Sequence, residues 1–362
     1  MSTSSLFQPL AAGPLSLRNR IAMAPMTRSR ALDNLPNALI ADYYRQRNQA
    51  GLIITEGTSP SPEGLGYPRV PGLFTDAQQQ AWEPVVTAGR AEGARMVVQL
   101  MHTGRIANRA NLPAGSVVLA PSAVRAAGQV WTDTQGLQDH DEPKAMDAGE
   151  IARVIADFAA AARRALQAGF DGVEIHAANG YLPAQFLNPR SNQREDDYGG
   201  SGENRRRFLL ELVDAVTAAI GPARVGVRLS PFNQFNDLEA DYAGEADEAL
   251  ALVAELSTRG IGYLHLIATS SAPAGLVDAV RQAFTGTLVL AGDFDGTRAV
   301  AALAAGRADV IAFARHFIGN PDLPERLRQS LPLAGFDAGT LYSADAVGYN
   351  DYPAYSATPL AA

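Results

Sequence analysis

A histidine, an asparagine and a tyrosine stand close together in the segment Glu174-Ile-His-Ala-Ala-Asn-Gly-Tyr-Leu182. His176 ends a run in which polar and apolar residues alternate, and Asn179 and Tyr181 follow it. Imidazole and amide groups can donate hydrogen bonds to an oxygen that gains negative charge, and a phenol with a reference pKa of about 10 keeps a proton to donate at neutral pH. Singly, the three have structural interpretations, as a hydrogen-bonded histidine and two loop residues. Their combination as His-x-x-Asn-x-Tyr after a strand favours a catalytic group.

Two further polar residues lie where a buried strand would favour apolar ones. Gln99 follows Val97 on the same strand face, and Arg228 lies on the inward face of Arg224–Leu229. An unpaired buried charge is costly, so Arg228 needs an anionic or dipolar partner. That partner is either a protein carboxylate in a structural ion pair or a bound ligand.

The surrounding chain alternates short β-branched runs with amphipathic helices. This alternation favours right-handed crossovers and a parallel sheet, and about eight such units without a linker favour an α/β fold of the (β/α)8 barrel type. We therefore expect one barrel domain over residues 1–362. The predicted strands are Arg20–Ala24, Leu52–Thr55, Met96–Leu100, Gly172–His176, Val225–Leu229, Gly262–Leu266, Leu288–Ala291 and Val310–Phe313.

One predicted helix precedes the strand of His176. Apolar residues recur at three- and four-residue spacing through 151–166, which predicts a helix with one apolar face. Asp147 and Glu150 have the form of an N-terminal capping box, and Gly169 suits the end of the helix.

The strand that follows alternates with period two. This pattern predicts that Val173 and Ile175 face the helices, while Glu174 and His176 point into the barrel. His176 would then lie at the carboxyl end of its strand, where barrel enzymes carry their active sites.

Three segments do not fit a simple strand–helix alternation. The opening segment Leu6–Leu17, with its Gly13-Pro14 turn, predicts a β-hairpin that closes the bottom of the barrel. The connections over residues 103–146 and 177–201 exceed ordinary loop lengths, which usually indicates an active-site role.

Composition excludes several classes of function. The 362 residues carry a formal net charge of -8, which argues against a nucleic-acid surface. The chain has no cysteine, so disulfides, thiolate metal sites and a cysteine nucleophile are excluded. No signal-peptide pattern opens the sequence and no apolar stretch reaches the roughly 20 residues needed to span a bilayer. We expect a cytoplasmic protein without a membrane partner.

Eight short motifs occur in register, each at a predicted strand end or in the loop after it. They are Ala24-Pro-Met-Thr-Arg-Ser-Arg30, Thr55-Glu-Gly57, Gln99-Leu-Met-His-Thr-Gly-Arg105, Glu174–Leu182, Phe186-Leu-Asn-Pro-Arg-Ser-Asn192, Arg228-Leu-Ser-Pro231, Phe313-Ala-Arg-His-Phe-Ile-Gly-Asn-Pro-Asp322 and Gly348-Tyr-Asn-Asp-Tyr-Pro353. From about Leu6 to Tyr355 the chain resembles the old yellow enzyme family of FMN-containing ene-reductases.

The resemblance implies a reaction in two steps. NADPH or NADH reduces a noncovalently bound FMN, and flavin N5 then transfers hydride to the β-carbon of an activated alkene such as an enone, enal, maleimide or nitroalkene. His176 and Asn179 would bind the substrate's carbonyl oxygen, which becomes enolate-like, and Tyr181 would protonate the α-carbon from the opposite face. Met101 and Tyr342 would line the substrate pocket.

The same resemblance assigns residues to the cofactor. Thr27 would contact O4 of the isoalloxazine ring, Gln99 its pyrimidine edge, and Arg228 the N1–O2 region, where reduction leaves negative charge. Alone, Thr27 has a structural interpretation as a cap of a helix or turn. The phosphate would lie after the seventh and eighth strands. The residues assigned to FMN are Pro25, Met26, Thr27, Gly57, Gln99, Arg228, Gly292, Asp293, Ala314 and Arg315.

Three positions depart from the family pattern. Asp293 stands where relatives usually have Gly or Asn, and Ala314 replaces a common Gly beside Arg315, so both bear on phosphate anchoring. Met101 occupies a position that is often Trp.

Two other functions remain open on sequence alone. A phosphate-binding barrel lyase or isomerase without flavin would need a Schiff-base lysine or a carboxylate base, but Lys144 lies in a long connection and no lysine ends a strand. A non-catalytic barrel would gain nothing from Gln99, His176 and Arg228. The basic cluster over residues 203–207 is interpreted as a solvated helix start, and His102 and His265 lack the spacing of a metal site.

Overall fold

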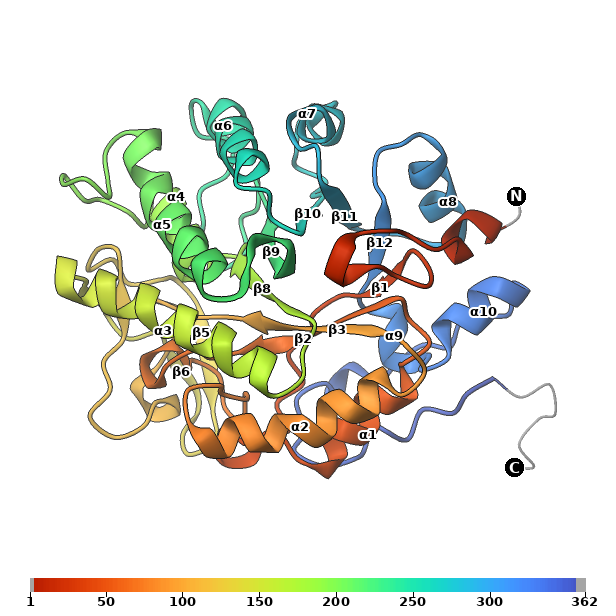
Figure 1. Cartoon of the computed structure of the whole chain (residues 1–362). Helices are drawn as coiled ribbons and strands as arrows, with labels where there is room; N and C mark the ends of the chain where they lie inside the picture. Colours follow the sequence, from red (N-terminus) through yellow and green to blue (C-terminus); the bar gives the residue numbers. More distant parts are fainter. Residues whose placement is uncertain (1–2, 356–362) are drawn as a thin grey trace.

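The computed structural model describes residues 3–355, and its centre is a closed barrel of eight parallel strands. Around the barrel the order is β1-β12-β11-β10-β9-β8-β3-β2, with β1 pairing to both β12 and β2. The prediction of an α/β barrel is thereby confirmed (Figure 1). Its strands are β1 (Ile21–Met23), β2 (Leu52–Thr58), β3 (Arg95–Leu100), β8 (Gly172–Ala177), β9 (Val225–Leu229), β10 (Tyr263–Ile267), β11 (Thr287–Ala291) and β12 (Val310–Phe313).

Helices surround the barrel as an outer layer (Figure 1). Buried side chains from the helices and from the outward faces of the strands form one large apolar cluster. The helices are α1 (Ala38–Gln46), α2 (Asp76–Arg90), α3 (Ala148–Gln167), α4 (Leu182–Leu187), α5 (Gly202–Ile220), α6 (Glu245–Thr258), α7 (Leu276–Ala283), α8 (Gly296–Ala304), α9 (His316–Gly319) and α10 (Leu323–Gln329).

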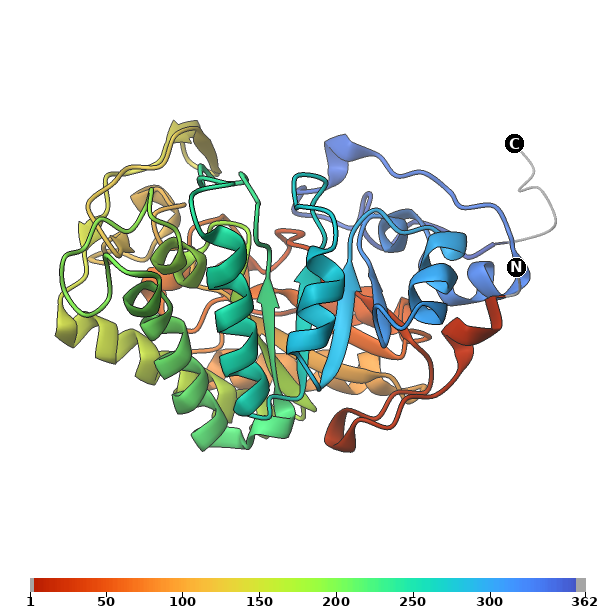
Figure 2. The same ribbon diagram turned by 90° about the horizontal axis from the view of Figure 1, so that it is seen from above.

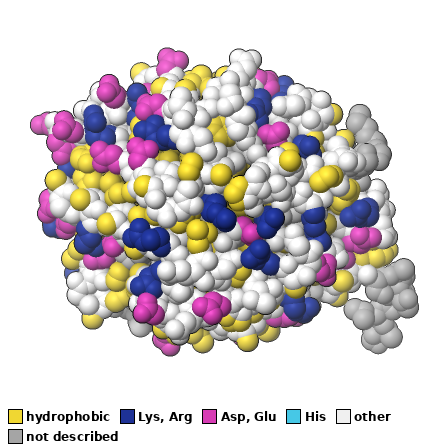
Figure 3. All heavy atoms as spheres, viewed as in Figure 1, with side chains coloured by type: hydrophobic (Ala, Val, Ile, Leu, Met, Phe, Trp, Pro, Cys, Tyr) yellow, Lys and Arg dark blue, Asp and Glu magenta, His cyan; other side chains and the backbone are white. Residues whose placement is uncertain are grey.

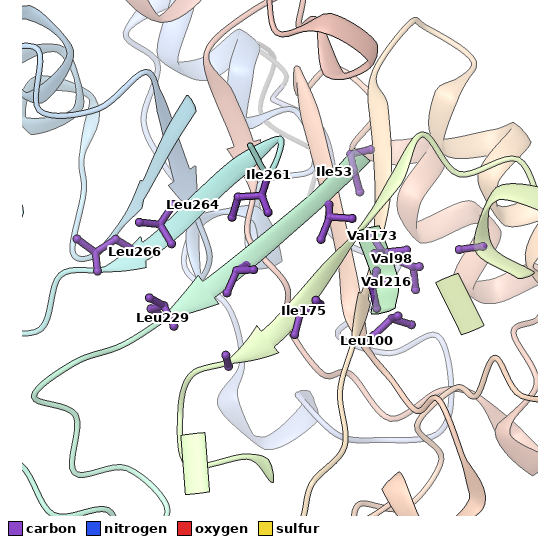
Figure 4. Packing of buried hydrophobic residues seen from close by; sticks show 14 of the residues in the cluster. Ile53, Val98, Leu100, Val173, Ile175, Val216, Leu229, Ile261, Leu264 and Leu266 are labelled. Atoms are coloured by element: carbon purple, nitrogen blue, oxygen red, sulfur yellow. The ribbon is translucent and has the colours of Figure 1, made fainter. Parts of the chain in front are cut away.

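The α3–β8 unit forms as predicted. Asp147 and Glu150 make both hydrogen bonds of the capping box at the start of α3, and Gly169 adopts the left-handed φ of +97° just beyond its end. Val173 and Ile175 are fully buried between β8 and the helices, among apolar side chains from β3, β9 and β10 (Figure 4). Glu174 and His176 are therefore on the face that points into the barrel.

Strand β2 is longer than predicted because it contains a bulge. Its pairing with β3 shifts register between Ile54 and Gly57, after which Gly57 pairs with Gln99. A bulge adds a residue to one strand and redirects the local side chains. The strand continues to Thr58, and the carboxylate of Glu56 is buried beside it.

The N-terminal segment closes the bottom of the barrel, opposite the long loops (Figure 2). Leu15 and Leu17 are buried with residues of the barrel interior such as Leu52 and Val97. The strand pairing expected of a hairpin is limited to one antiparallel bridge, Leu10 to Leu17. Short 3-10 helices, η1 (Thr3–Phe7) and η2 (Gly13–Leu15), take the place of longer strands, and in η2 Pro14 fixes φ and lacks an N–H.

The two long connections gather at the carboxyl end of the strands (Figure 2). The first contains the hairpin β5 (Gln129–Thr132) and β6 (Gly136–Asp139), and the parallel pair β4 (Leu119–Ala120) and β7 (Lys144–Ala145). The second contains α4. Five more 3-10 turns complete the described chain: η3 (Leu32–Asn34), η4 (Pro62–Gly64), η5 (Arg109–Asn111), η6 (Pro222–Arg224) and η7 (Ala338–Thr340).

The surface seen in Figure 3 mixes cationic and anionic side chains without a block of one sign. Within residues 3–355 no helix is both long enough and apolar enough to cross a membrane.

Candidate active site

A cavity of about 940 Å³ opens at the carboxyl end of the barrel. Residues from strand ends and from the long loops line it together, as expected for a barrel enzyme. Nine of the predicted site residues are brought together here: Pro25, Thr27, Gln99, Met101, His176, Asn179, Tyr181, Arg228 and Tyr342.

A buried carboxylate lies beneath Gln99. Glu174 accepts hydrogen bonds from Gln99 Nε2 at 2.7 Å, from the Tyr263 hydroxyl at 3.0 Å and from His265 Nδ1 at 2.8 Å. Burial alone would raise the pKa of Glu174, but His265 and the nearby Arg228 hold that pKa below its ordinary value. Because an ionised carboxylate only accepts, Gln99 donates through Nε2 and leaves its Oε1 for another partner. Sequence reasoning had placed Glu174 inside the barrel without giving it a role.

Arg228 comes from β9, next to the strand of Glu174. Its side chain is buried, and Nε has no hydrogen-bond partner. No carboxylate within residues 3–355 forms an ion pair with it at 4 Å or less. The charge of Glu174 acts on Arg228 only from a greater distance. The ion-pair interpretation of Arg228 is therefore not supported, and its guanidinium suits an anionic or dipolar ligand in the cavity.

His176 ends β8 with its ring against the ring of Tyr181, the centroids 4.8 Å apart. The backbone N–H of Ala178 donates to His176 Nδ1 at 3.3 Å, so the ring proton belongs on Nε2. Burial, followed by the charges of Arg228 and His265, lowers the pKa of His176 well below 6.5. The imidazole is thus a neutral hydrogen-bond donor through Nε2.

Tyr181 precedes α4 and is buried. Its hydroxyl lies 3.1 Å from the hydroxyl of Tyr67, and the two rings meet edge to face. Burial raises the pKa of Tyr181, so the hydroxyl keeps its proton at neutral pH. Tyr67 was missed by sequence reasoning; its only signal is a tyrosine between Gly66 and Pro68 in a loop that joins β2 to α2.

Met101 lines the cavity directly after the end of β3. It is buried with Ile106, Ala126 and Tyr181. A Cβ at Gly57 would lie 2.5 Å from Met101 Sδ, so this sulfur fills the space that the glycine leaves.

The outer rim of the cavity is aromatic. Tyr342, Trp131 and Phe235 line it from three different connections, Trp131 from strand β5, and each is more than half exposed. Only Tyr342 was predicted, because nothing in the sequence near Trp131 or Phe235 indicates which loops meet at the mouth.

Six of the predicted cofactor residues do not line this cavity. Gly57 adjoins it through Met101, and Met26 packs against the apolar core. The other four, Gly292, Asp293, Ala314 and Arg315, follow the neighbouring strands β11 and β12. Asp293 points into solvent and forms an ion pair with Arg298, whereas the exposed Arg315 has no side-chain partner within residues 3–355.

The residues at the floor of the cavity fit a flavin ring. The pyrimidine edge of an isoalloxazine carries an N–H donor between two carbonyl acceptors. The Gln99 Oε1, the Arg228 guanidinium and the Thr27 hydroxyl offer an acceptor, a cation and a hydroxyl in one cavity. Thr27 caps no helix or turn in the described chain, so its structural interpretation is not supported. In residues 3–355 no group of His, Asp or Glu side chains is arranged to hold a metal ion.

Comparison with known proteins gives matches along nearly the whole chain. A sequence profile of the NADH:flavin oxidoreductase / NADH oxidase family matches residues 5–334. The chain is 39% identical to 12-oxophytodienoate reductase 2 of Arabidopsis thaliana over 367 residues, covering 98% of this chain and 96% of that protein. It is likewise 39% identical to 12-oxophytodienoate reductase 1 of Oryza sativa subsp. japonica, covering 96% and 92%.

Solved structures give the same result. Morphinone reductase in complex with tetrahydroNAD is 46% identical, with a TM-score of 0.93 and 98% of both chains covered. The old yellow enzyme homologue from Zymomonas mobilis is 40% identical, with a TM-score of 0.93 and coverage of 97% of this chain and 100% of that one.

Proposed function

Since the chain belongs to the NADH:flavin oxidoreductase / NADH oxidase family, the family of old yellow enzyme, we propose how its residues carry out the family's reaction. The protein is an FMN-dependent oxidoreductase that uses a reduced nicotinamide to reduce activated alkenes. FMN, when bound, accepts hydride from the nicotinamide and supplies it to the alkene.

His176 and Asn179 are the proposed donors to the carbonyl oxygen of the alkene substrate. His176 is neutral with its proton on Nε2, and Asn179 lines the same cavity. Negative charge grows on that oxygen as the β-carbon accepts hydride. Donors that are already in place stabilise this charge in the transition state more than in the ground state.

Tyr181 is the proposed acid for the α-carbon. Its hydroxyl keeps a proton because burial raises its pKa, and Tyr67 lies within hydrogen-bond distance to take part in reprotonation. Met101 and Tyr342 are the proposed walls of the substrate pocket.

We propose that Thr27, Gln99, Arg228 and backbone groups of Pro25, Met26 and Gly57 hold the flavin ring. The observation that most supports this role is the buried Arg228 guanidinium without a carboxylate partner at the floor of the cavity. The FMN phosphate would lie beside Gly292, Asp293, Ala314 and Arg315. Arg315 favours this location because its side chain is exposed and unpaired in the described structure.

Three narrower proposals accompany this function. Residues 1–362 form one domain, the reductant is NADPH or NADH, and the protein acts in the cytoplasm. The absence of cysteine is compatible with that compartment.

The decisive experiment is the absorption spectrum of the purified protein, followed by turnover with each nicotinamide and 2-cyclohexenone. We expect a yellow protein with about one FMN per chain, released on denaturation because no cysteine is present for a thioether link. A colourless protein that gains neither absorbance nor thermal stability with added FMN would exclude the proposed site.

A further inference from the structure

We propose that Asn233, in the loop between β9 and α6 (residues 230–244), is a positioning residue that orients the side-chain amide of Asn179 with its N–H toward substrate. The inference rests on the proposed function, in which Asn179 is a donor. A carboxamide has two orientations of nearly equal shape, and only one of them presents N–H to the cavity. With the other orientation, an oxygen would face the substrate oxygen and repel it.

The orientation is set by a relay that starts at a backbone N–H. Phe235 N donates to Asn233 Oδ1 at 2.9 Å, and a backbone nitrogen can only donate. Asn233 Nδ2 is then the atom left to bond Asn179, and it donates to Asn179 Oδ1 at 2.9 Å. Asn179 Nδ2 therefore remains free for the cavity, which Asn179 lines.

The same loop also holds the backbone of Asn179. Asn179 N donates to Ser230 Oγ at 2.9 Å, and Asn236 Nδ2 donates to Asn179 O at 2.7 Å. Asn179 has a left-handed φ of +56°, which is uncommon for a residue other than glycine. Three hydrogen bonds from one loop thus fix both the conformation and the amide of a single residue.

The middle of the loop is anchored independently. Asp237 forms ion pairs with Arg190 at 2.8 Å and with the buried Arg105 at 3.4 Å. Asn236 lies close enough to Gly180 that a Cβ at that glycine would be 2.7 Å from the Asn236 Cβ. The loop therefore has little freedom to move away from Asn179.

The relay of Asn233 has a counterpart at His176. There the backbone N–H of Ala178 occupies Nδ1 and leaves Nε2–H for the cavity. For both proposed donors, a backbone N–H thus determines which side-chain atom presents a hydrogen to the cavity. It acts directly on His176 and through Asn233 on Asn179.

The Asn233→Asp substitution tests the relay with almost no change in shape. One carboxylate oxygen still accepts from Phe235 N, but the other now faces Asn179 Oδ1, so the Asn179 amide must turn and present its oxygen to the cavity. We expect phenol, whose phenolate oxygen mimics the enolate, to bind the holoprotein about 10- to 100-fold more weakly, the range of a hydrogen bond to a charged group. Titration of the long-wavelength charge-transfer band measures this binding. Asn233→Ala leaves the amide free to turn either way and should give a smaller loss.

A double-mutant cycle with Asn179→Ala separates the relay from the added charge. If Asn233 acts through Asn179, neither Asn233 substitution weakens phenol binding further once the Asn179 side chain is removed. A full loss that persists in the Asn179→Ala background would overturn the relay and point to charge or to loop disruption. Asn233→Ala carries no charge, so its cycle decides the question if the Asp variant fails to retain FMN.

The outcomes distinguish this inference from the proposed function. Unchanged phenol binding in Asn179→Ala would refute the donor role itself and the relay with it. Weaker binding in Asn179→Ala, together with unchanged binding in both Asn233 variants, would refute the relay alone.

Discussion

Tyr181 combines two features that separate its role from that of the other site residues. Its hydroxyl keeps a proton because burial raises its pKa, and it contacts the hydroxyl of Tyr67 rather than the groups at the floor of the cavity. In the proposed mechanism, reduction of FMN by a nicotinamide needs no proton from this residue, whereas reduction of an enone does. We therefore expect the two half-reactions to depend on Tyr181 differently.

Tyr181→Phe should leave anaerobic flavin reduction near normal and slow the reaction of reduced enzyme with 2-cyclohexenone by about 10²-fold or more. Stopped-flow measurement of each half-reaction gives both rates. Tyr67→Phe serves as the comparison and should lose less, because the Tyr181 hydroxyl, the proposed acid, is still present in that variant. Equal losses in both half-reactions of Tyr181→Phe would indicate a structural role.

Arg228 should control the flavin more than the substrate. Arg228→Ala removes the buried cation, so we expect weaker FMN binding and a reduction potential lower by about 50 mV, or about 2 kcal/mol for a two-electron couple. Arg224→Ala is the matched control, because Arg224 precedes the same strand at its opposite end and donates to Asp171 O. A potential that is equal in the two variants would place Arg228 away from the ring.

At the scale of elements, the segment of residues 338–350 shows how a loop with little regular structure is held at the cavity. Arg30 is fully buried and donates to the carbonyls of Thr340 at 2.9 Å, Asp345 at 3.2 Å and Val347 at 3.0 Å. Tyr342, within this span, lines the cavity rim. One planar guanidinium thus replaces the backbone ladder of a helix or strand.

Arg30→Lys should loosen this segment, because an ammonium offers three donors where the guanidinium offers five. We expect the free energy of unfolding to fall by about 2–4 kcal/mol and hydrogen exchange to rise over residues 340–347. Arg45→Lys is the control; Arg45 is exposed and pairs with Asp42, so its cost should stay below about 1 kcal/mol. Unchanged exchange in Arg30→Lys would show that the segment is held by other contacts.

Elements whose pattern is local were predictable from the sequence. The eight barrel strands and the capped helix α3 follow from periodicity and from residues a few positions apart. Two features required tertiary contacts that no local pattern encodes. The bulge that extends β2 depends on its register with β3, and the N-terminal hairpin is reduced to one bridge because Leu15 and Leu17 pack into the barrel.

The residues of the site also divide into those that a local sequence pattern identifies and those that depend on tertiary contacts. His176, Gln99 and Arg228 were identifiable because each places a polar group in an apolar strand. Tyr67, Asn233, Trp131 and Phe235 were not, because they lie in connections whose meeting point depends on the closed barrel. The Ser-Pro motif after Arg228 marked the start of the β9–α6 loop but gave no sign of its hydrogen bonds to Asn179.

At the scale of the whole molecule, buried ionisable groups give opposing contributions to stability. Burial lowers the pKa of His102 to about 3 and also lowers the pKa values of His140, His176 and His265. These histidines contribute stability above pH 6.5. That stability is lost as the pH falls, because the histidines of the unfolded chain then bind protons while those of the folded chain remain neutral. The stability that Glu56 contributes depends on pH in the opposite direction. Burial raises its pKa from 4.5 to about 7, and its Oε1 has no hydrogen-bond partner.

Glu56→Gln should therefore become more stable relative to wild type as the pH rises. The folded state holds the Glu56 proton more tightly than the unfolded state, so the stability it contributes is complete below pH 4.5 and is lost as the pH passes through about 7. The amide keeps an acceptor for Arg28 N, which donates to Glu56 Oε2 at 3.3 Å, and it cannot ionise. Denaturant unfolding of both holoproteins should be measured at about pH 5, 6, 7 and 8. The free energy of unfolding of Glu56→Gln minus that of wild type should grow by at most about 3 kcal/mol over this range, since one pKa unit corresponds to about 1.4 kcal/mol. The histidine contributions cancel in this difference, and any fixed cost of the amide appears as a constant offset.

Glu195→Gln, on the surface, should give a curve parallel to wild type. Parallel curves for Glu56→Gln as well would mean that Glu56 is ionised throughout, held so by Arg28 and Arg30 against the cost of burial.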